Sequence, residues 1–245
     1  MIALVSASGG VGKSTLALFI GHVCARQGIK TAVLEGDLQF GDMGYWLGLD
    51  VGLSNLAQGQ SCIPIPISNN LNLYKAPVLP EVAEDIADDV IRLVSEARLN
   101  CDLLVADTGQ FWSGLTAELV CSASLVMLIA DTRGASIYGA IKAIELCGRL
   151  GIPQARIACV LNRASGLPKS EIERIRDALG CDEIFRIADG KTAIETLVST
   201  GRIEELVEEA ADPILDTEQM LASLLPRIGI EFTPTTHKRR RRFFS

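Results

Sequence analysis

The feature that most constrains this chain is the stretch Ser8-Gly9-Gly10-Val11-Gly12-Lys13-Ser14-Thr15 near its N-terminus. An apolar run, Ile2-Ala3-Leu4-Val5, precedes it and a second, at 16–20, follows it, so the pattern is strand, glycine-rich loop and helix. In that setting glycines allow backbone N–H groups to converge on phosphate oxygens. The helix that begins near Lys13 adds the positive end of its dipole. The stretch therefore predicts a phosphate-binding loop.

Each residue type in the loop has an expected role. Lys13 is predicted to pair with the β- and γ-phosphates. Ser14 is predicted to offer its hydroxyl to Mg²⁺, which prefers oxygen ligands and shares its site with nucleotide phosphates. ATP and Mg²⁺ are therefore the expected ligands, although a plain glycine-rich turn between strand and helix is the structural alternative. The predicted nucleotide-binding residues of the loop are Gly9, Gly10, Val11, Gly12, Lys13, Ser14 and Thr15.

Strand and helix patterns alternate along the 245 residues. This alternation predicts an α/β fold of the three-layer, phosphate-loop type, in which helices flank a mostly parallel central sheet. We expect one domain over residues 1–232, followed by a basic and disordered tail at 233–245. The expected strands are 30–34, 71–75, 102–107, 125–130, 157–161 and 183–187, and the expected helices are 53–58, 82–98, 131–150, 170–179, 189–200 and 213–227.

Three finer expectations concern edges and helix starts. Prolines at 64 and 66 exclude residues 62–67 from the centre of a sheet, so the segment is an edge strand or a connector. Asp131 and Thr132 are expected to cap the helix that follows them. Ser170-Glu171-Ile172-Glu173 has the form of a capping box at a helix start.

Acidic residues follow two predicted strands. Glu35, Asp37 and Asp42 come after the strand at 30–34, and Asp107 ends the apolar strand at 102–107. Because ligands bind beyond the carboxyl ends of parallel strands, we expect these acids to face the phosphates. Asp37 is the predicted catalytic acid that orients the attacking water or a Mg²⁺-bound water, with Lys13 as its catalytic partner. Asp107 has the form of a Walker B acid that orders the waters on Mg²⁺.

Two alternatives accompany these site assignments. An acidic cluster in a loop is often only solvated and has no ligand, and this alternative remains open for residues 35–42. The strand at 157–161 ends at Asn162-Arg163, where an amide has the paired donor and acceptor that read the base edge of adenine. Asn162 is therefore the predicted base contact.

Charge and cysteine content limit the class of protein. The net charge is −7, and it is about −12 once the five cations of Lys238–Arg242 are set aside, so the body has no general nucleic-acid signature. The seven cysteines show no CxxC pair and indicate reduced thiols in the cytoplasm. No signal segment or stretch long enough to span a bilayer is evident. We therefore expect a cytoplasmic protein that is at most attached to a membrane surface.

These motifs together resemble the MinD/ParA family of deviant-Walker ATPases over nearly the whole chain. Within it, the segments 38–42, Leu47-Gly48, Ala76-Pro77 and Asn162-Arg163 look most like the CpaE/TadZ proteins of Flp pilus assembly. The resemblance implies an ATP-dependent homodimer with both nucleotides at its interface, which binds a partner or a surface in one nucleotide state. By position it assigns phosphate and metal roles to Lys13, Ser14 and Asp107, the water-positioning role to Asp37 and the adenine contact to Asn162.

Two departures from the family pattern bear on activity. The signature lysine that reaches the phosphates of the partner subunit should occupy position 8, where this chain has Ser8. The expected ATPase is therefore weak, unless Arg133, Arg163 or Lys191 supplies the cation. Pilus-type members also commonly carry an N-terminal receiver-like domain, whereas this chain begins at its first strand.

Three functions follow as alternatives. The first is a nucleotide switch that positions or helps to assemble a pilus or secretion-type machine. The second is a chromosome- or plasmid-partition ATPase that coats DNA, which requires a basic surface that the acidic body does not offer. The third is a catalytically weak scaffold that holds nucleotide as a structural ligand. An iron–sulfur reductase is disfavoured, because neither Cys101 nor Cys121 lies in the glycine-rich loop such a site requires.

The C-terminal tail combines Lys238–Arg242 with Phe243 and Phe244. Near anionic lipid each Lys or Arg contributes about 1 kcal/mol, and the phenylalanines can insert at the interface. Weak peripheral association with the inner face of the membrane, or a polar location, is one expectation. A solvated tail and a DNA contact are the alternatives.

Overall fold

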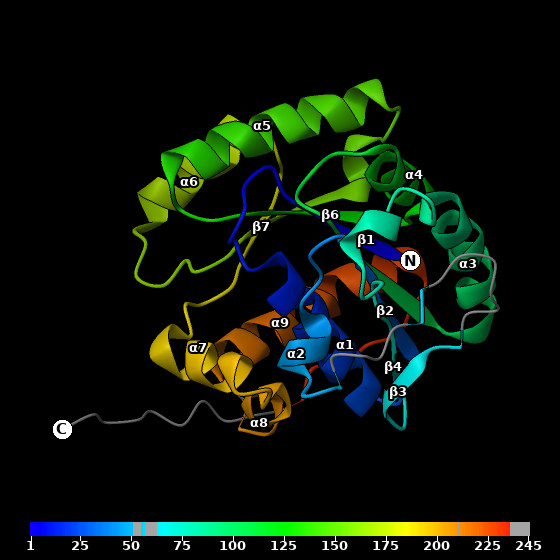
Figure 1. Ribbon diagram of the computed structural model, residues 1–245. Coiled ribbons are helices and arrows are strands. Elements are labelled where there is room, and N and C mark those ends of the chain that lie inside the picture. The colour runs from blue at the N-terminus through cyan, green and yellow to red at the C-terminus, as the bar shows by residue number, and fades with distance from the viewer. Residues whose placement is uncertain (51–54, 57–62, 210, 236–245) are drawn as a thin grey trace.

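The computed structural model describes residues 1–50, 55–56, 63–209 and 211–235. Among these residues, eight strands form one sheet in the order β3-β4-β2-β5-β1-β6-β7-β8 (Figure 1). Strand β3 runs antiparallel to β4, and every other neighbouring pair is parallel. The predicted α/β fold with a mostly parallel sheet between helices is confirmed.

The strands and helices alternate as follows. The strands are β1 (Ile2–Val5), β2 (Thr31–Gly36), β3 (Ile65–Ser68), β4 (Leu71–Tyr74), β5 (Leu103–Thr108), β6 (Leu125–Ala130), β7 (Ile157–Leu161) and β8 (Ile184–Arg186). The helices are α1 (Lys13–Arg26), α2 (Met43–Trp46), α3 (Ala87–Asn100), α4 (Gly114–Ser122), α5 (Gly134–Arg149), α6 (Lys169–Leu179), α7 (Lys191–Ser199), α8 (Ile203–Glu208) and α9 (Asp212–Leu224).

The sheet separates two hydrophobic cores, because successive side chains of a strand point to opposite faces. Ala3 and Val5 of β1 join the core under α3, α4, α5 and α6. Ile2 and Leu4 join the core under α1, α8 and α9. Since both faces of the central strands are covered, these strands read as continuous apolar runs. The arrangement is the predicted three-layer architecture (Figure 1).

The edge position expected from the prolines is confirmed for the residues that the structure describes. Pro66 lies in β3, which is an edge strand, and the register with β4 shifts between Pro66 and Ser68. A proline removes one donor from the ladder, so it is tolerated at an edge and at such a shift. Cys62, and most of the helix expected at 53–58, lie outside the described residues.

Several predicted helix starts are wrong. Helix α3 begins at Ala87, because Pro80–Val82 instead forms a short 3₁₀ turn. Asp131 does not cap α5: its carboxylate accepts a hydrogen bond from the Arg133 N–H, and Arg133 occupies the cap position without a side-chain capping bond. The capping box at 170–173 does not form either, since Pro168 occupies the cap position and α6 already begins at Lys169.

Three helices, α2, α4 and α8, are absent from the sequence predictions. Strand β2 also runs two residues further than expected, which places Glu35 within the strand. Residues 231–235 follow α9 without regular structure, and Thr235 accepts a hydrogen bond from Gln27 at 3.1 Å. The basic cluster of the predicted tail lies outside the described residues. In the part of the chain that is described, no helix has the length and apolar character needed to cross a bilayer.

Candidate functional site

The loop between β1 and α1 has the backbone geometry of a phosphate cradle. Gly10 and Gly12 have φ of 69° and 84°, a left-handed conformation that only glycine adopts without strain. Gly12 also caps α1, and its carbonyl accepts the first helical bond from the Leu16 N–H at 3.0 Å. A Cβ at Gly12 would lie 2.4 Å from Asn162 Nδ2, so the position excludes any side chain. The positive φ angles and the lack of room for a Cβ explain why the motif has glycine at these positions.

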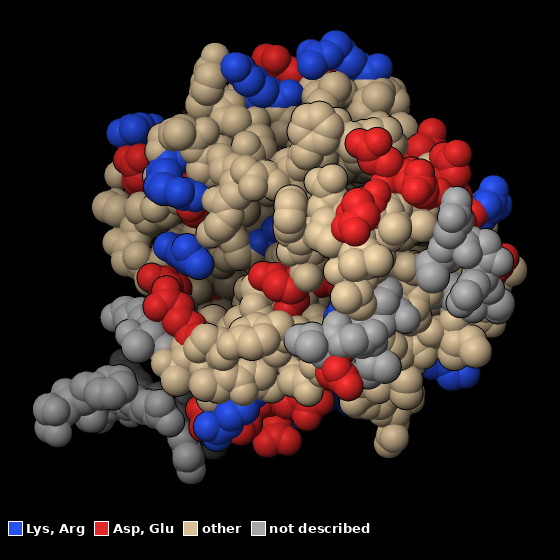
Figure 2. Space-filling model, viewed as in Figure 1, with Lys and Arg blue, Asp and Glu red and all other residues tan. Residues whose placement is uncertain are grey.

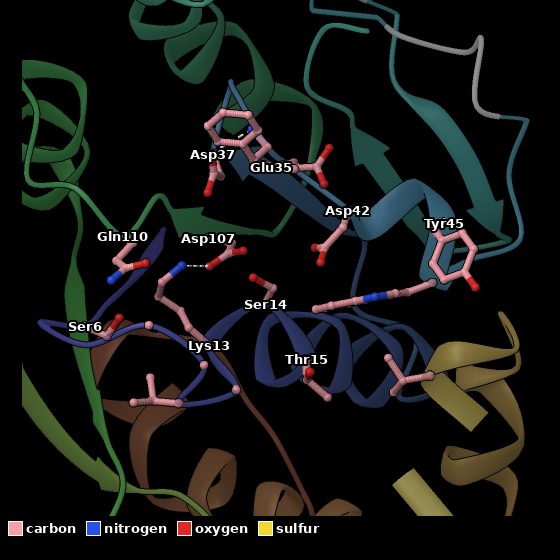
Figure 3. Close-up of a pocket in the computed structure, with 18 of the residues that line it drawn as sticks. Ser6, Lys13, Ser14, Thr15, Glu35, Asp37, Asp42, Tyr45, Asp107 and Gln110 are labelled. Atoms are coloured by element: carbon pink, nitrogen blue, oxygen red, sulfur yellow. Dashed lines mark hydrogen bonds and ion pairs between the residues drawn. The ribbon is translucent and has the colours of Figure 1, made fainter. Parts of the chain in front are cut away.

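A cavity of about 490 Å³ opens above this loop. Figure 3 shows Lys13, Ser14 and Thr15 on its floor, and Asp37, Asp42 and Asp107 from the loop after β2 and the end of β5 on the opposite side. Helices α2 and α7 form the remaining wall. The predicted catalytic, phosphate and metal residues are therefore brought together at the carboxyl ends of the central strands.

Lys13 and Asp107 form a buried ion pair at the centre of this cavity. Lys13 Nζ lies 2.5 Å from Asp107 Oδ1 (Figure 3) and also donates to the carbonyl oxygen of Thr108. Asp107 is almost completely buried, and burial raises the pKa of its carboxyl; the nearby Lys13 ammonium, its hydrogen bond and the Ser14 hydroxyl oppose that rise. The pair holds a cation at the start of α1.

Ser14 and Asp107 are adjacent oxygen donors. The Ser14 hydroxyl lies near enough to the Asp107 carboxyl to lower the pKa of that group, so both oxygens border one point beside the loop. A hydroxyl and a carboxylate are the hard ligands that Mg²⁺ takes when nucleotide oxygens and waters supply the rest. The donor set therefore fits the predicted metal. Mg²⁺ there would neutralise charge on the phosphates when bound.

The other acids, Glu35, Asp37 and Asp42, also line the cavity. Asp37 Oδ1 accepts a hydrogen bond from the Phe40 N–H at 3.1 Å, which fixes the turn that follows β2. Burial raises the pKa of Asp42 to about 6, with the nearby Asp107 and Asp37 charges adding to the rise. Asp37 and Asp42 therefore face the phosphate loop across the cavity, as the sequence predicted.

Glu35 borders the cavity as expected, but its carboxylate is engaged by backbone N–H groups. Its carboxylate accepts hydrogen bonds from the Met43 N–H at 2.7 Å and the Ala76 N–H at 2.9 Å. Glu35 thereby joins the start of α2 to the end of β4, and burial raises its pKa to about 7. Because β2 extends beside β5 as far as Gly36, Glu35 is a strand residue opposite Asp107 and not a loop residue.

Asn162 holds the phosphate loop from the side. Its Nδ2 donates to the Val11 carbonyl at 2.8 Å, and its Oδ1 accepts from the Arg163 N–H at 3.0 Å. Asn162 borders a second, smaller hollow that Phe19, Ile187 and Pro213 also line. This hollow adjoins the loop at Gly12. Arg163 is the one described non-glycine residue with a positive φ, 54°.

Ser8 and the three proposed substitute cations are placed differently. Ser8 lines the main cavity, and Arg163 lines both hollows. Arg133 lies outside the cradle: its Nε is 2.7 Å from Asp131 Oδ2, and its Nη2 donates to the Gly9 carbonyl at 3.2 Å. Lys191 begins α7, and its side chain lies outside what the structure describes.

The structure adds residues that the sequence reading missed. Gln110 follows β5 and leans over the loop, where a Cβ at Gly9 would lie 2.7 Å from its Oε1. Tyr45 and Ser199 close the far wall, since the Tyr45 hydroxyl donates to the Ser199 carbonyl at 2.9 Å. The position of Gln110 just after β5 could have indicated this contact from the sequence. Nothing local in the sequence indicated the contact between α2 and α7.

Comparison with known proteins agrees with this geometry. The family model described as the CobQ/CobB/MinD/ParA nucleotide binding domain matches residues 2–187. An uncharacterized ATP-binding protein of Methanocaldococcus jannaschii is 25% identical over 216 residues, which are 80% of this chain and 73% of that protein.

Two solved structures show the same fold. A ParA family ATPase from Chlorobium tepidum superposes with a TM-score of 0.77 at 21% identity, over 88% of this chain and 96% of its own. The septum site-determining protein MinD from Pyrococcus horikoshii, in complex with Mg-ADP, superposes with a TM-score of 0.76 at 17% identity, over 94% and 98%.

Proposed function

We propose, on the premise that this chain belongs to the CobQ/CobB/MinD/ParA nucleotide-binding family, that it is a Mg²⁺-dependent ATPase that acts as a nucleotide switch. In this proposal Lys13 and the loop amides hold the phosphates, Ser14 and Asp107 hold Mg²⁺, and Asp37 orients the attacking water. Asn162 contacts the adenine. The ATP-bound form is a homodimer, and its partner contacts change with the nucleotide.

The observation that carries the proposal is the position of Lys13. Its ammonium lies at the centre of a cradle otherwise made of backbone dipoles, beside an acid and a hydroxyl suited to Mg²⁺. A charge-assisted bond to phosphate contributes about 1.5–3 kcal/mol, so removal of this cation weakens nucleotide binding about ten- to a hundredfold.

Calorimetry with ATP and Mg²⁺ tests this assignment. Lys13→Ala is expected to lose most of the binding enthalpy, whereas Lys142→Ala, on the outer part of α5, binds as the wild type does. Equal affinity in wild type and Lys13→Ala would refute the phosphate-loop proposal.

The finer proposal is that the switch positions or helps to assemble a pilus or secretion-type machine. It is supported by the segment 38–42 and by Ala76-Pro77, the features most like the pilus-assembly subgroup. In the structure these segments meet at one place, because Glu35 bonds to the Ala76 N–H and to the Met43 N–H just after 38–42. A partition ATPase is the alternative, since the structural relatives include a putative plasmid partition protein from Borrelia burgdorferi.

The location of a fluorescent fusion in a bacterial host that has Flp pili discriminates the functions. A polar focus supports the machine-positioning role, a coat over the nucleoid supports partition, and a diffuse signal supports a nucleotide-holding scaffold. The same fusion without residues 238–245 tests whether the basic tail contributes to the location.

The tail is proposed to give weak membrane association. Sedimentation with vesicles of anionic lipid at low salt is expected for the full chain and not for the chain without 238–245. Because screening acts over about 8 Å at physiological salt, the bound fraction should fall as salt rises. Sedimentation that the deletion leaves unchanged would contradict a role for the tail.

A further inference from the structure

A third hollow, distinct from the one beside Asn162 and with a volume of about 870 Å³, lies beside the nucleotide cavity. The loop after β2, the loop after β5 and the first turns of α3 and α4 surround it. Asp37, Phe40 and Gln110 line both this hollow and the nucleotide cavity, so these residues form a ridge across which the two spaces are continuous. We call this third hollow the α3–α4 groove.

Two phenylalanines project from the ridge. Phe40 is 76% exposed and Phe111 is 80% exposed, although burial of such a side chain contributes about 1.5–3 kcal/mol. The groove between them has an apolar floor that includes Ala87, Ile91 and Leu115. An apolar groove with exposed aromatic residues at its rim is typical of a protein-binding surface.

The backbone holds both phenylalanines in place. The Phe111 carbonyl accepts hydrogen bonds from the Ser113 N–H and the Thr116 hydroxyl, each at 3.0 Å. The Phe40 N–H donates to Asp37 Oδ1. Fixed backbones reduce the entropy lost when a partner covers the rings. The exposed rings are therefore presented on an ordered surface.

Charge decides what kind of partner fits. Asp37, Glu84, Asp88 and Glu118 line the groove, and no Lys or Arg is among the described residues that line it. Figure 2 shows acidic side chains gathered on this side of the molecule, over the region where Figure 1 has α3 and α4. A second copy of the chain placed there through the same surface would bring like charges together, which is unfavourable.

We propose that the α3–α4 groove binds a cationic amphipathic helix of a partner protein, with apolar side chains between Phe40 and Phe111 and Lys or Arg side chains toward Glu84, Asp88 and Glu118. The proposal builds on the partner-binding switch proposed above and names the partner's chemistry. Because Phe40 bonds to Asp37, such a helix would also constrain the acid proposed to orient the water.

The test uses a fluorescein-labelled helix of about 14 residues with leucine on one face and lysine on the other, titrated against the full chain without nucleotide at physiological ionic strength. Anisotropy is expected to show tighter binding than for a scrambled peptide of the same composition. Phe111→Ser and Glu84→Lys should each weaken the binding by about tenfold or more.

Matched controls lie elsewhere on the surface. Leu99→Ser removes an exposed apolar side chain at the far end of α3, and Glu204→Lys reverses an exposed charge on α8; both should bind the peptide as wild type does. Equal binding of the scrambled peptide, or binding that Phe111→Ser and Glu84→Lys leave unchanged, would overturn the proposal.

Light scattering of the nucleotide-free chain completes the test. A dimer that Phe111→Ser dissociates would assign the groove to a second copy and also overturn the proposal. Since none of these measurements includes ATP, their failure is distinct from a failure of Lys13→Ala to lose nucleotide binding.

Discussion

Lys13 Nζ lies 2.5 Å from Asp107 Oδ1, although 94 residues separate the two in sequence. The contact arises because β1 and β5 are neighbours in the sheet, so that the loop after β1 lies beside the end of β5. The lysine proposed to bind phosphate thus neutralises the acid proposed to hold Mg²⁺. Phosphate and Mg²⁺ would have to replace this interaction for both residues.

The ion pair predicts a stability effect that is separate from nucleotide binding. Lys13→Ala leaves a buried carboxylate without its cation, which is expected to lower the free energy of unfolding by about 3 kcal/mol. The double variant Lys13→Ala/Asp107→Asn should recover part of that loss, because the amide carries no charge, while ATP binding stays absent. Urea denaturation of the ligand-free proteins measures both. A double variant no more stable than Lys13→Ala would show that the pair is not the cause.

Ser8 predicts slow turnover. A cation supplied to the transferring phosphoryl group changes rates by about 10³–10⁵ in arginine-finger systems, and a serine hydroxyl supplies no charge. Ser8→Lys should raise steady-state phosphate release or strengthen ATP-dependent dimerisation in light scattering. Ser170→Lys, on exposed α6, is the matched control.

Brisk hydrolysis by the wild-type dimer would contradict this prediction. It would then direct attention to Arg163, which lines the cavity, before Arg133, whose guanidinium is bonded to Asp131 and the Gly9 carbonyl outside the cradle.

Asn162 is expected to set the preference for adenine. An amide that pairs with a base edge contributes about 1–3 kcal/mol of discrimination, so Asn162→Ala should reduce the ratio of ATP to GTP affinity by about tenfold. Some loss of affinity for both nucleotides is also expected, because the bond to the Val11 carbonyl is removed. Asn100→Ala, at the exposed end of α3, is the control. An unchanged ratio measured by competition would limit Asn162 to supporting the loop.

Because His22 is buried, we predict that the free energy of unfolding falls at acidic pH. Burial in α1 lowers its pKa from 6.5 to about 4, and its Nε2 has no hydrogen-bond partner. The unfolded chain therefore binds more protons between those values, and stability falls as pH decreases from about 6.5 to 4. The loss is at most about 3 kcal/mol.

A comparison of His22→Leu with the wild type isolates this effect. Glu35 acts in the opposite direction, since its raised pKa of about 7 makes its contribution decrease as pH rises from 4.5 to 7. It is present in both proteins, so the difference between their unfolding free energies depends on His22. A difference that stays constant between pH 7 and pH 4 would contradict the assignment.

The sequence predicted those parts of the site that depend on local pattern. The cradle is local, because Gly10, Gly12 and the start of α1 follow from one strand, one loop and one helix. Asp107 was identifiable since an apolar strand ends in an acid. Glu35 was not, because only its pairing with Asp107 across the sheet shows that it lies in the strand and bonds to α2 and β4.

Contacts between distant segments were also beyond the local pattern. The bond from Arg133 to the Gly9 carbonyl joins residues 124 apart, and neither segment alone indicates it. Helix starts failed for a related reason. The side chains expected to cap α5 and α6 could bond locally, but backbone geometry at Arg133 and Pro168 determined where the helices begin. The exposure of Phe40 and Phe111 depends on three-dimensional packing in the same way.

The chain contains two tryptophans, and both lie at the phosphate loop. The Trp112 indole N–H donates to the Ser6 carbonyl at 3.2 Å, just before the glycines, and Trp46 lines the nucleotide cavity. Indole emission depends on hydrogen bonding and solvent contact, so the intrinsic fluorescence of the unlabelled protein originates where ligand would bind. Trp112→Phe would leave Trp46, on the α2 wall, as the single emitter, and Trp46→Phe would leave Trp112, beside the α3–α4 groove. With these two variants the nucleotide cavity and the α3–α4 groove could be followed separately in real time.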